Sequence, residues 1–417
     1  MQSEGNGRAG TGSGEKGDGA FERRAGGSLD HRVIRRHNGK RILDAVRRHG
    51  PISRAELAQR SELSAPTVSA LVDDLVDRRG LLRNVGKGES SGGRRPLMVD
   101  FNADFGFVVG IDIGSRALRS VLADLRGQVV HRHEERTPTT SREAILDATM
   151  AAVDRLFVDA GIGKDKMFAI GVGAPGMTDV THGRVISAVN LKGWTDVPLR
   201  DLLQERFHVP VFVDNDVNMA AMGEQWAGCA KDCPNFVFIA LGAGVGAGIV
   251  IDGRLYRGTR WYAGEISHLL LDHRCWDVDY GEQGYLESYA GAEAIAREWQ
   301  RLRPNAPAVP SADGAAEVFE AARYGDTRAG EIVRQVAVYL GVGIANIAAV
   351  LDPALIVFGG GISHVGDQLL QPVRQVVARI VPNVPELRVS AAGDDAQVFG
   401  SLYSALQLAD VRLFESL

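Results

Sequence analysis

The 417-residue sequence has few cysteines and no long apolar run. Its three cysteines cannot form a disulfide framework, so we expect reduced thiols in a reducing compartment. No uninterrupted apolar run reaches the ~18 residues of a membrane helix, and the N-terminus lacks the apolar core of a signal peptide. These absences argue against membrane proteins and secreted disulfide-rich domains. We expect a cytoplasmic protein of two or three domains.

The first thirty residues have almost no large apolar side chains. They contain nine glycines, and such a segment buries too little surface to offset the entropy lost on ordering. We therefore expect residues 1–30 to be a disordered tail.

Basic residues are concentrated in one part of an otherwise acidic chain. Residues 31–100 hold 15 Lys and Arg against 8 Asp and Glu, a net charge of +7, whereas the whole chain carries −5. A basic module on an acidic body predicts that only the module meets a polyanion. A solvated basic face is the alternative that charge alone leaves open.

The basic module contains the pattern of a helix-turn-helix. Residues 40–50 place apolar side chains on one helical face, and Ser53 with Glu56 forms the capping box that starts a second helix. Ser64 begins a third helix with Pro66 in its first turn. Small polar residues at the start of this third helix suit a major groove, so we predict DNA contacts from Ser64, Thr67 and Ser69.

A basic hairpin follows the third helix. Residues 81–85 and 96–101 have the composition of two strands, and a Gly/Ser loop carries Lys87, Arg94 and Arg95 between them. Such a wing can bring cations to phosphates or a minor groove. Residues 31–100 are therefore predicted to be a winged helix-turn-helix that binds DNA.

The body contains three glycine-rich turns, each at the end of an apolar strand. Strands are predicted over 105–113 and 118–125, and Asp112 lies near the end of the first. Glycines let backbone N–H groups approach phosphate oxygens, although a tight turn alone explains any one of them. Their repetition predicts a duplicated α/β fold for a nucleotide or a sugar. The glycines are Gly114, Gly242, Gly244, Gly359 and Gly360.

Seven stretches of the chain are distinctive together: GVGAPGMTD (171–179), NLKGW (190–194), VPVFVDNDVNMAAMGEQWAG (209–228), LGAGVGAGIVIDGRLYRG (241–258), AGEISH (263–268), GEQGYLES (281–288) and ALIVFGGGIS (354–363). They resemble the ROK family of repressors, open reading frames and sugar kinases, in its transcriptional-regulator branch. The resemblance covers the chain from about residue 31 onward. It implies a ribonuclease H-like, actin-like α/β body with a cleft between a first lobe (101–225, completed by a helix over 398–417) and a second lobe (226–397).

The resemblance also implies a hexose site. The family's kinases use an Asn-Asp pair, here Asn215 and Asp216, in which the aspartate takes a proton from the attacking sugar hydroxyl. Glu265, His268 and Glu287 complete the contacts to sugar hydroxyls. Gly176 and Asn190 are expected in the same pocket.

The phosphate-binding turns depart from the family pattern. ROK kinases begin with Asp-x-Gly-Gly-Thr, whereas this chain reads Asp112-Ile113-Gly114-Ser115-Arg116. The later Gly-Thr-Gly reads Gly-Ala-Gly at 242–244. Both changes put ATP binding in doubt, so a sugar sensor is expected, with a slow kinase as the alternative.

The family's zinc site is expected to be lost. In the family, one histidine and three cysteines supply it, and alignment on Gly281, Gly284, Leu286 and Glu287 puts Val278, Tyr280 and Tyr285 at the cysteine positions. Val and Tyr are poor ligands for Zn²⁺. We expect Tyr280 and Tyr285 to fill the space by aromatic packing. An improvised site remains the alternative, built from His268, Asp272, His273 and Cys275.

The function expected from the sequence is a sugar-responsive transcriptional regulator, most simply a repressor. Its partners are operator DNA and a sugar or phosphosugar effector, and it is expected to act as a homodimer or homotetramer without contact to a membrane. The alternatives are a hexose or N-acetylhexosamine kinase with an accessory DNA-binding domain, and a DNA-binding protein whose body serves only oligomerisation.

Overall fold

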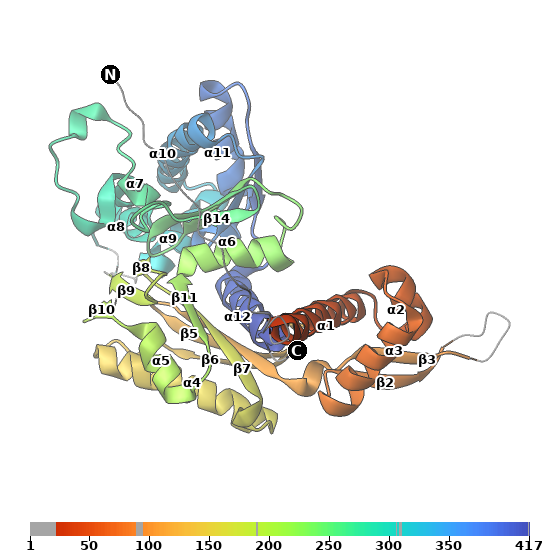
Figure 1. The fold of residues 1–417 in the computed structure, drawn as a ribbon. Helices are drawn as coiled ribbons and strands as arrows, with labels where there is room; N and C mark the ends of the chain where they lie inside the picture. Colours follow the sequence, from red (N-terminus) through yellow and green to blue (C-terminus); the bar gives the residue numbers. More distant parts are fainter. Residues whose placement is uncertain (1–21, 89–94, 189–190, 306, 308–310, 416) are drawn as a thin grey trace, which may run out of the picture. The chain divides into compact units, whose positions relative to one another are not determined.

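The chain divides into two compact units. The computed structural model describes residues 22–88, 95–188, 191–305, 307, 311–415 and 417. The smaller unit extends to Asn102 and also includes Phe414–Leu417, and the larger one spans Ala103–Leu413 (Figure 1).

Helices and one small sheet form the smaller unit as a winged helix. The Ser53 hydroxyl accepts the Glu56 N–H at 3.2 Å, and the Glu56 carboxylate accepts the Ser53 N–H at 3.1 Å, which confirms the capping box. Ser64 caps the third helix as predicted. The elements are α1 (Glu22–His49), β1 (Ile52–Ser53), α2 (Arg54–Ser61), α3 (Ala65–Asp73), a π-helical turn (Asp74–Arg78), β2 (Leu82–Lys87) and β3 (Leu97–Phe101), with the strands in the order β1-β3-β2.

The smaller unit has its own core, to which its C-terminal residues contribute. The Arg36 Nε donates a hydrogen bond to the Phe414 carbonyl at 2.8 Å, and the guanidinium lies 4.4 Å from the Phe414 ring centroid. Arg79 donates to the Leu417 carbonyl at 2.9 Å. The predicted inner faces of the helices are all buried: Ile42, Leu43, Val46, Val68, Leu71, Val72 and Leu75.

Helix α1 corrects the prediction of a disordered tail over residues 1–30. The helix begins at Glu22, inside that segment, and residues 1–21 lie outside the described part of the chain. Apolar content was the wrong criterion here, because a helix already formed over its buried turns can extend by one backbone hydrogen bond per added residue.

Two five-stranded sheets of matching topology form the larger unit. In each, the two pairings on one side of the central strand are antiparallel and the two pairings on the other side are parallel. This repetition confirms the duplicated, actin-like α/β fold. The first sheet has the order β11 (Val211–Asn215), β7 (Met167–Ala174), β4 (Phe107–Ile113), β5 (Ala117–Asp124), β6 (Val129–Arg136), and the second β14 (Arg254–Tyr256), β13 (Val245–Ile251), β12 (Phe236–Leu241), β15 (Leu355–Gly359), β16 (Glu386–Val389).

The remaining elements follow the same duplication. A helix follows the last strand of each sheet, α6 after β11 and α12 after β16. A small third sheet joins β8 (Met177–Asp179), β9 (Arg184–Ser187) and β10 (Thr195–Val197). The helices are α4 (Arg142–Ala160), α5 (Leu199–Phe207), α6 (Asp216–Ala227), α7 (Gly284–Ala290), α8 (Ala292–Leu302), α9 (Ser311–Arg323), α10 (Thr327–Leu351), α11 (Asp367–Ile380) and α12 (Ala396–Glu415).

Glycines let α12 approach the first sheet and α6 at backbone distance. A Cβ on Gly171 of β7 would lie 1.9 Å from the Ser401 carbonyl oxygen, and one on Gly400 would lie 1.8 Å from the Met219 carbonyl oxygen. Helix α12 therefore packs on the first sheet, in the position predicted for a helix over 398–417. The boundary of that prediction is wrong at its end, because the residues from Phe414 on group with the smaller unit.

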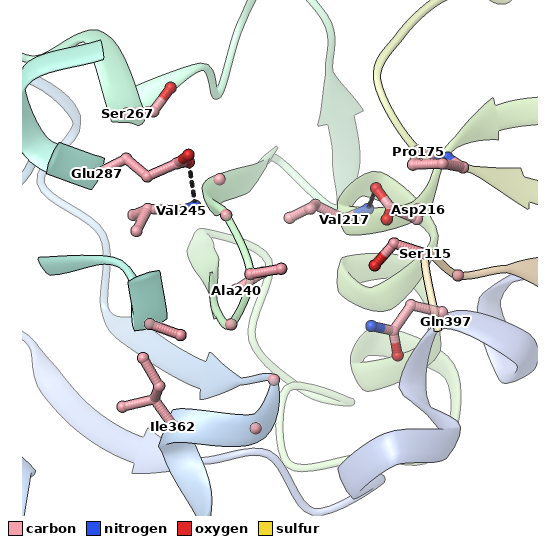
Figure 2. Close-up of a pocket in the computed structure, with 18 of the residues that line it drawn as sticks. Ser115, Pro175, Asp216, Val217, Ala240, Val245, Ser267, Glu287, Ile362 and Gln397 are labelled. Carbon is pink, nitrogen blue, oxygen red and sulfur yellow. Dashed lines mark hydrogen bonds between the residues drawn. The ribbon is translucent and has the colours of Figure 1, made fainter. Parts of the chain in front are cut away.

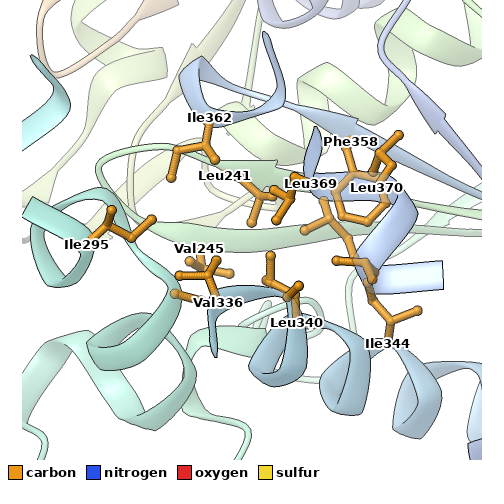
Figure 3. Close-up of a cluster of buried hydrophobic side chains, with 14 of the residues drawn as sticks. Leu241, Val245, Ile295, Val336, Leu340, Ile344, Phe358, Ile362, Leu369 and Leu370 are labelled. Carbon is orange, nitrogen blue, oxygen red and sulfur yellow. The ribbon is translucent and has the colours of Figure 1, made fainter. Parts of the chain in front are cut away.

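Helix α10 lies in the core of the second sheet. Helix α10 is long and apolar enough to cross a membrane by length and composition alone. Most of its apolar stretch, 61%, is buried inside the protein. Figure 3 shows Val336, Leu340 and Ile344 of this helix packed beside Phe358 and Leu241 of the sheet, so we interpret α10 as a core helix.

Candidate functional site

A cavity of about 800 Å³ lies in the larger unit, bounded by corresponding turns of the two sheets (Figure 2). The β4–β5 turn lines it with Gly114, and the β12–β13 turn lines it with Gly242 and Gly244. Position 114 has no room for a side chain, because a Cβ on Gly114 would lie 2.7 Å from the Ala117 carbonyl oxygen. The duplicated topology therefore brings two motifs distant in sequence to one site.

Asn215 and Asp216 lie at the start of α6, where β11 ends. The Asn215 side-chain oxygen accepts the N–H groups of Val217 (2.8 Å) and Asn218 (3.2 Å), and its amide nitrogen donates to the Gly176 carbonyl at 2.9 Å. Asp216 lines the cavity beside this cap. The pKa of Asp216 is raised to about 7, chiefly by burial; the Val217 N–H opposes this shift and the nearby Glu265 charge adds to it.

Glu265 and Glu287 line the cavity from the second sheet's side. Figure 2 shows Glu287 and Val245 on the side opposite Asp216, and the Glu287 carboxylate accepts the Val245 N–H at 2.8 Å. Burial raises the pKa of Glu287 to about 6, and Glu265 contributes in the same direction. Burial likewise raises the pKa of Glu265.

Asp112 is a further buried carboxylate, at the end of β4. Its carboxylate lies 3.5 Å from the Arg119 guanidinium, which also lies 3.5 Å from Glu134. Burial raises the pKa of Asp112 to about 7, the Asp216 charge adds to the shift, and Arg119 opposes it. Arg116, on the adjoining turn, is exposed and lines the same cavity.

Two predicted site residues do not line the cavity, and one cannot be placed. His268 is exposed, and its ring lies beside Tyr262 with centroids 6.0 Å apart, while its neighbour Ser267 lines the cavity. Gly359 is buried within β15, where a Cβ would lie 2.2 Å from the Phe238 ring. Asn190 lies outside the described residues. The other predicted sugar and phosphate positions line the cavity: Asp112, Gly114, Gly176, Asn215, Asp216, Gly242, Gly244, Glu265, Glu287 and Gly360.

The segment that carries zinc in the family does not fit a metal here. Tyr280 and Tyr285 pack edge to face with ring centroids 5.2 Å apart, in the aromatic contact expected from the sequence. Tyr289 and Tyr339, which the sequence reading missed, extend the cluster and stack on each other at 4.4 Å. In the described ranges no group of three His, Cys, Asp or Glu side chains is arranged around a possible ion. Asp272, one of the ligands of the improvised site, forms an ion pair with Arg274 at 2.6 Å.

The cavity suits a ligand with many hydroxyl groups. The carboxylates of Asp112, Asp216, Glu265 and Glu287 line it together with the Asn215 amide, and each carboxylate oxygen can accept hydrogen bonds from hydroxyls. With pKa values of about 7, the carboxylates of Asp112 and Asp216 are suited to accepting a proton near neutral pH. The arrangement can therefore bind a sugar and can position its hydroxyl next to a base.

The predicted DNA-contacting helix presents small side chains outward. Ser64 is exposed, and its hydroxyl lies 2.8 Å from that of Thr67, so both are held by the helix cap. Ser69 is half-buried beside Arg54, which forms an ion pair with Asp73 at 2.6 Å. The cap fixes the start of α3, and the Arg54 side chain lies against Ser69 and Asp73 farther along the helix.

The wing has the predicted hairpin, and its cations face solvent. Strands β2 and β3 pair antiparallel, and Lys87 and Arg95 at their ends are exposed. Arg94 lies outside the described residues. An exposed cation at each end of the hairpin suits a contact to phosphates.

Sequence reasoning missed several residues around the cavity. Gln397, from the first turn of α12, lines it without any sequence motif that could have indicated this. Asp214 and Arg257 form an ion pair next to the site, and a signal existed for both: they lie within motifs already singled out.

Models of two protein families match the chain. The ROK family model matches residues 108–407, and the MarR family model matches residues 40–85. The two matches correspond to the body with the cavity and to the helices of the winged helix.

Known proteins resemble the chain over different lengths. The xylose repressor of Bacillus spizizenii is 30% identical over 379 residues, covering 89% of this chain and 95% of that protein. The glucokinase of Halalkalibacterium halodurans is 36% identical over 306 residues, covering 70% of this chain and 92% of the kinase. A solved ROK family transcriptional regulator, a homologue of the E. coli MLC protein, has a TM-score of 0.74 at 24% identity and covers 92% of this chain and 98% of its own.

Proposed function

This chain belongs to the ROK family, and we propose that it is a sugar-responsive transcriptional repressor. One observation carries the proposal: the same chain combines a winged helix with exposed wing cations and a cavity lined by carboxylates and an amide. The winged helix binds operator DNA, and the cavity binds a sugar or phosphosugar that changes the affinity for that DNA.

The extent of similarity favours a regulator. The relative named xylose repressor matches most of the chain, including the winged helix, whereas the relative named glucokinase matches only 70% of it. A ligand that shifts DNA affinity must bind the DNA-competent and DNA-incompetent states differently. In the proposed mechanism, closure of the two lobes on the sugar supplies that difference.

The supporting proposals concern assembly and cofactors. We place the protein in the cytoplasm as a homodimer or homotetramer, because helix-turn-helix proteins read palindromic half-sites as dimers. It is proposed to function without zinc, and the packing of Tyr280 on Tyr285, the two tyrosines that the sequence register aligns with family cysteines, supports this. Light scattering and metal analysis of the purified protein test these statements, and one tightly held zinc per chain contradicts the second.

The DNA experiment begins with in vitro selection from a random duplex library, using the full chain. The selected duplex is then titrated at fixed salt, with and without D-xylose or D-glucose. We expect a palindromic site and a change in its affinity with one of these sugars. A chain that selects no sequence above bulk DNA contradicts the proposal.

A sugar kinase is the second candidate, favoured by Asp216 with its pKa near 7 in the cavity. Against it stand Arg116 and Ala243 in the two phosphate-binding turns. A coupled assay of ADP release with D-glucose and ATP separates the candidates. Turnover that disappears in Asp216→Asn establishes a kinase.

A further inference from the structure

A buried ion pair next to the cavity joins the two sheets of the larger unit. Arg257 follows β14 of the second sheet, and Asp214 lies in β11 of the first. The Arg257 Nε and Nη2 atoms lie 2.8 and 2.7 Å from the same Asp214 oxygen. The Asp214 side chain is 1% exposed and that of Arg257 is 23% exposed.

Each partner is also tied to one wall of the cavity. The other Asp214 oxygen accepts the Asn215 N–H at 2.7 Å and the Asn218 side-chain amide at 3.0 Å, which fixes the residues on either side of Asp216. The Arg257 carbonyl accepts the Ala263 N–H at 3.2 Å, two residues before Glu265. Hydrogen bonds thus connect the ion pair to the segment that carries Asp216 and to the segment that carries Glu265.

Neither Arg257 nor Asp214 lines the cavity, so neither contacts a ligand there. Stability alone is a weak reason for such a pair, because replacing a buried ion pair by apolar residues is often neutral or stabilising. A fixed geometry between the two walls is a sufficient reason, since misplacing binding groups by about 1 Å costs much of their effect.

We propose that the Arg257–Asp214 ion pair is a positioning clamp that sets the separation of Asp216 and Glu265 and so determines the cavity's affinity for a polyhydroxylated ligand. The proposal rests on the sugar-binding function given above. Arg257 and Asp214 affect ligand binding indirectly, by holding the segments that carry Asp216 and Glu265.

Four variants test the clamp: Arg257→Met, Asp214→Asn, the double variant, and Arg206→Met as the matched control. Arg206 pairs with Asp154 at the same 2.7 Å in the same unit, and neither residue lines the cavity. The double variant leaves no buried charge without a partner, so it serves if a single variant does not fold.

D-Xylose and D-glucose are titrated calorimetrically into each variant, beside thermal melts. We expect at least a tenfold weaker affinity in Arg257→Met and in the double variant, and affinity within twofold of the parent in Arg206→Met. The melting temperature recovers in the double variant while the affinity does not. Affinity that recovers together with stability, or that stays within twofold in Arg257→Met, overturns the proposal.

Hydrogen exchange provides a readout that needs no sugar. In Arg257→Met we expect faster exchange in peptides covering 215–218 and 263–266 together, and no such change in Arg206→Met. If the parent protein binds neither sugar, the proposed function fails on these probes while the exchange result still decides the clamp. Unchanged exchange at both segments overturns it.

Discussion

The contact between α6 and α12 gives a sharp prediction about glycine. Gly400 lies inside α12 with helical backbone angles, where alanine would normally stabilise a helix by ~1 kcal/mol. Its Cβ, however, would lie 1.8 Å from the Met219 carbonyl oxygen of α6. The two backbones must separate by more than 1 Å to admit it, because ordinary contacts begin above about 3 Å.

The expected loss of stability is the difference between the cost of the clash and the gain in helix propensity. Overpacking of a core costs ~1–3 kcal/mol, and a rigid backbone obstacle favours the upper end. After the propensity gain of about 1 kcal/mol, Gly400→Ala should lower the free energy of unfolding by ~2 kcal/mol. The matched control is Gly330→Ala in α10, where a Cβ meets nothing within 4 Å and only the gain of ~0.5–1 kcal/mol remains.

Urea unfolding of both variants, followed by circular dichroism, measures the difference. The Gly400→Ala midpoint should move down and the Gly330→Ala midpoint up, with unchanged slopes. Because α6 carries Asn215 and Asp216 at its start, Gly400→Ala should also weaken sugar binding. Stabilisation of Gly400→Ala to the extent seen in the control would refute the close approach of the two helices.

Three further predictions concern the cavity and the winged helix. Sugar affinity should rise with pH between 5 and 8, because the ionised carboxylates of Asp216 (pKa about 7) and Glu287 (pKa about 6) accept stronger hydrogen bonds from hydroxyls than their protonated forms do; calorimetry at several pH values checks this, and a flat profile contradicts it. Ser53→Ala removes the capping box and should cost ~1 kcal/mol in the urea unfolding of the smaller unit. Lys87→Ala and Arg95→Ala should each weaken binding to all DNA sequences alike and reduce the salt dependence by about one ion; a loss of sequence preference at constant salt dependence would assign them to base contacts instead.

Local sequence signals predicted the winged helix well. The capping box at Ser53 and Glu56 and the cap at Ser64 depend on residues three positions apart, and both form as expected. The apolar faces of α1 and α3 are also buried as their spacing indicates. Such features depend only on residues within one helical turn of each other, so they can be predicted from the local sequence alone.

The cavity was predictable only in part, because it is built from distant contacts. The motifs identified Asp216 and Glu265, but the direction of a side chain depends on its turn: His268 is exposed while Ser267 lines the cavity. Gly359 was misread because a glycine packed under the Phe238 ring looks the same in sequence as one in a phosphate-binding turn. Gln397 carries no local signal, since only the packing of α12 brings it to the site.

The smaller unit is assembled from both ends of the sequence, and this limits how it can be exchanged or shortened. Phe414 and Leu417 contact Arg36 and Arg79, so a fragment ending at Asn102 lacks two of its own packing partners. A deletion of residues 414–417 would damage the winged helix while leaving every described cavity residue in place. Recombination between relatives that swaps only their N-terminal segments would therefore pair a winged helix with a foreign C-terminal turn. Among relatives, substitutions at these two distant stretches of the sequence should therefore covary.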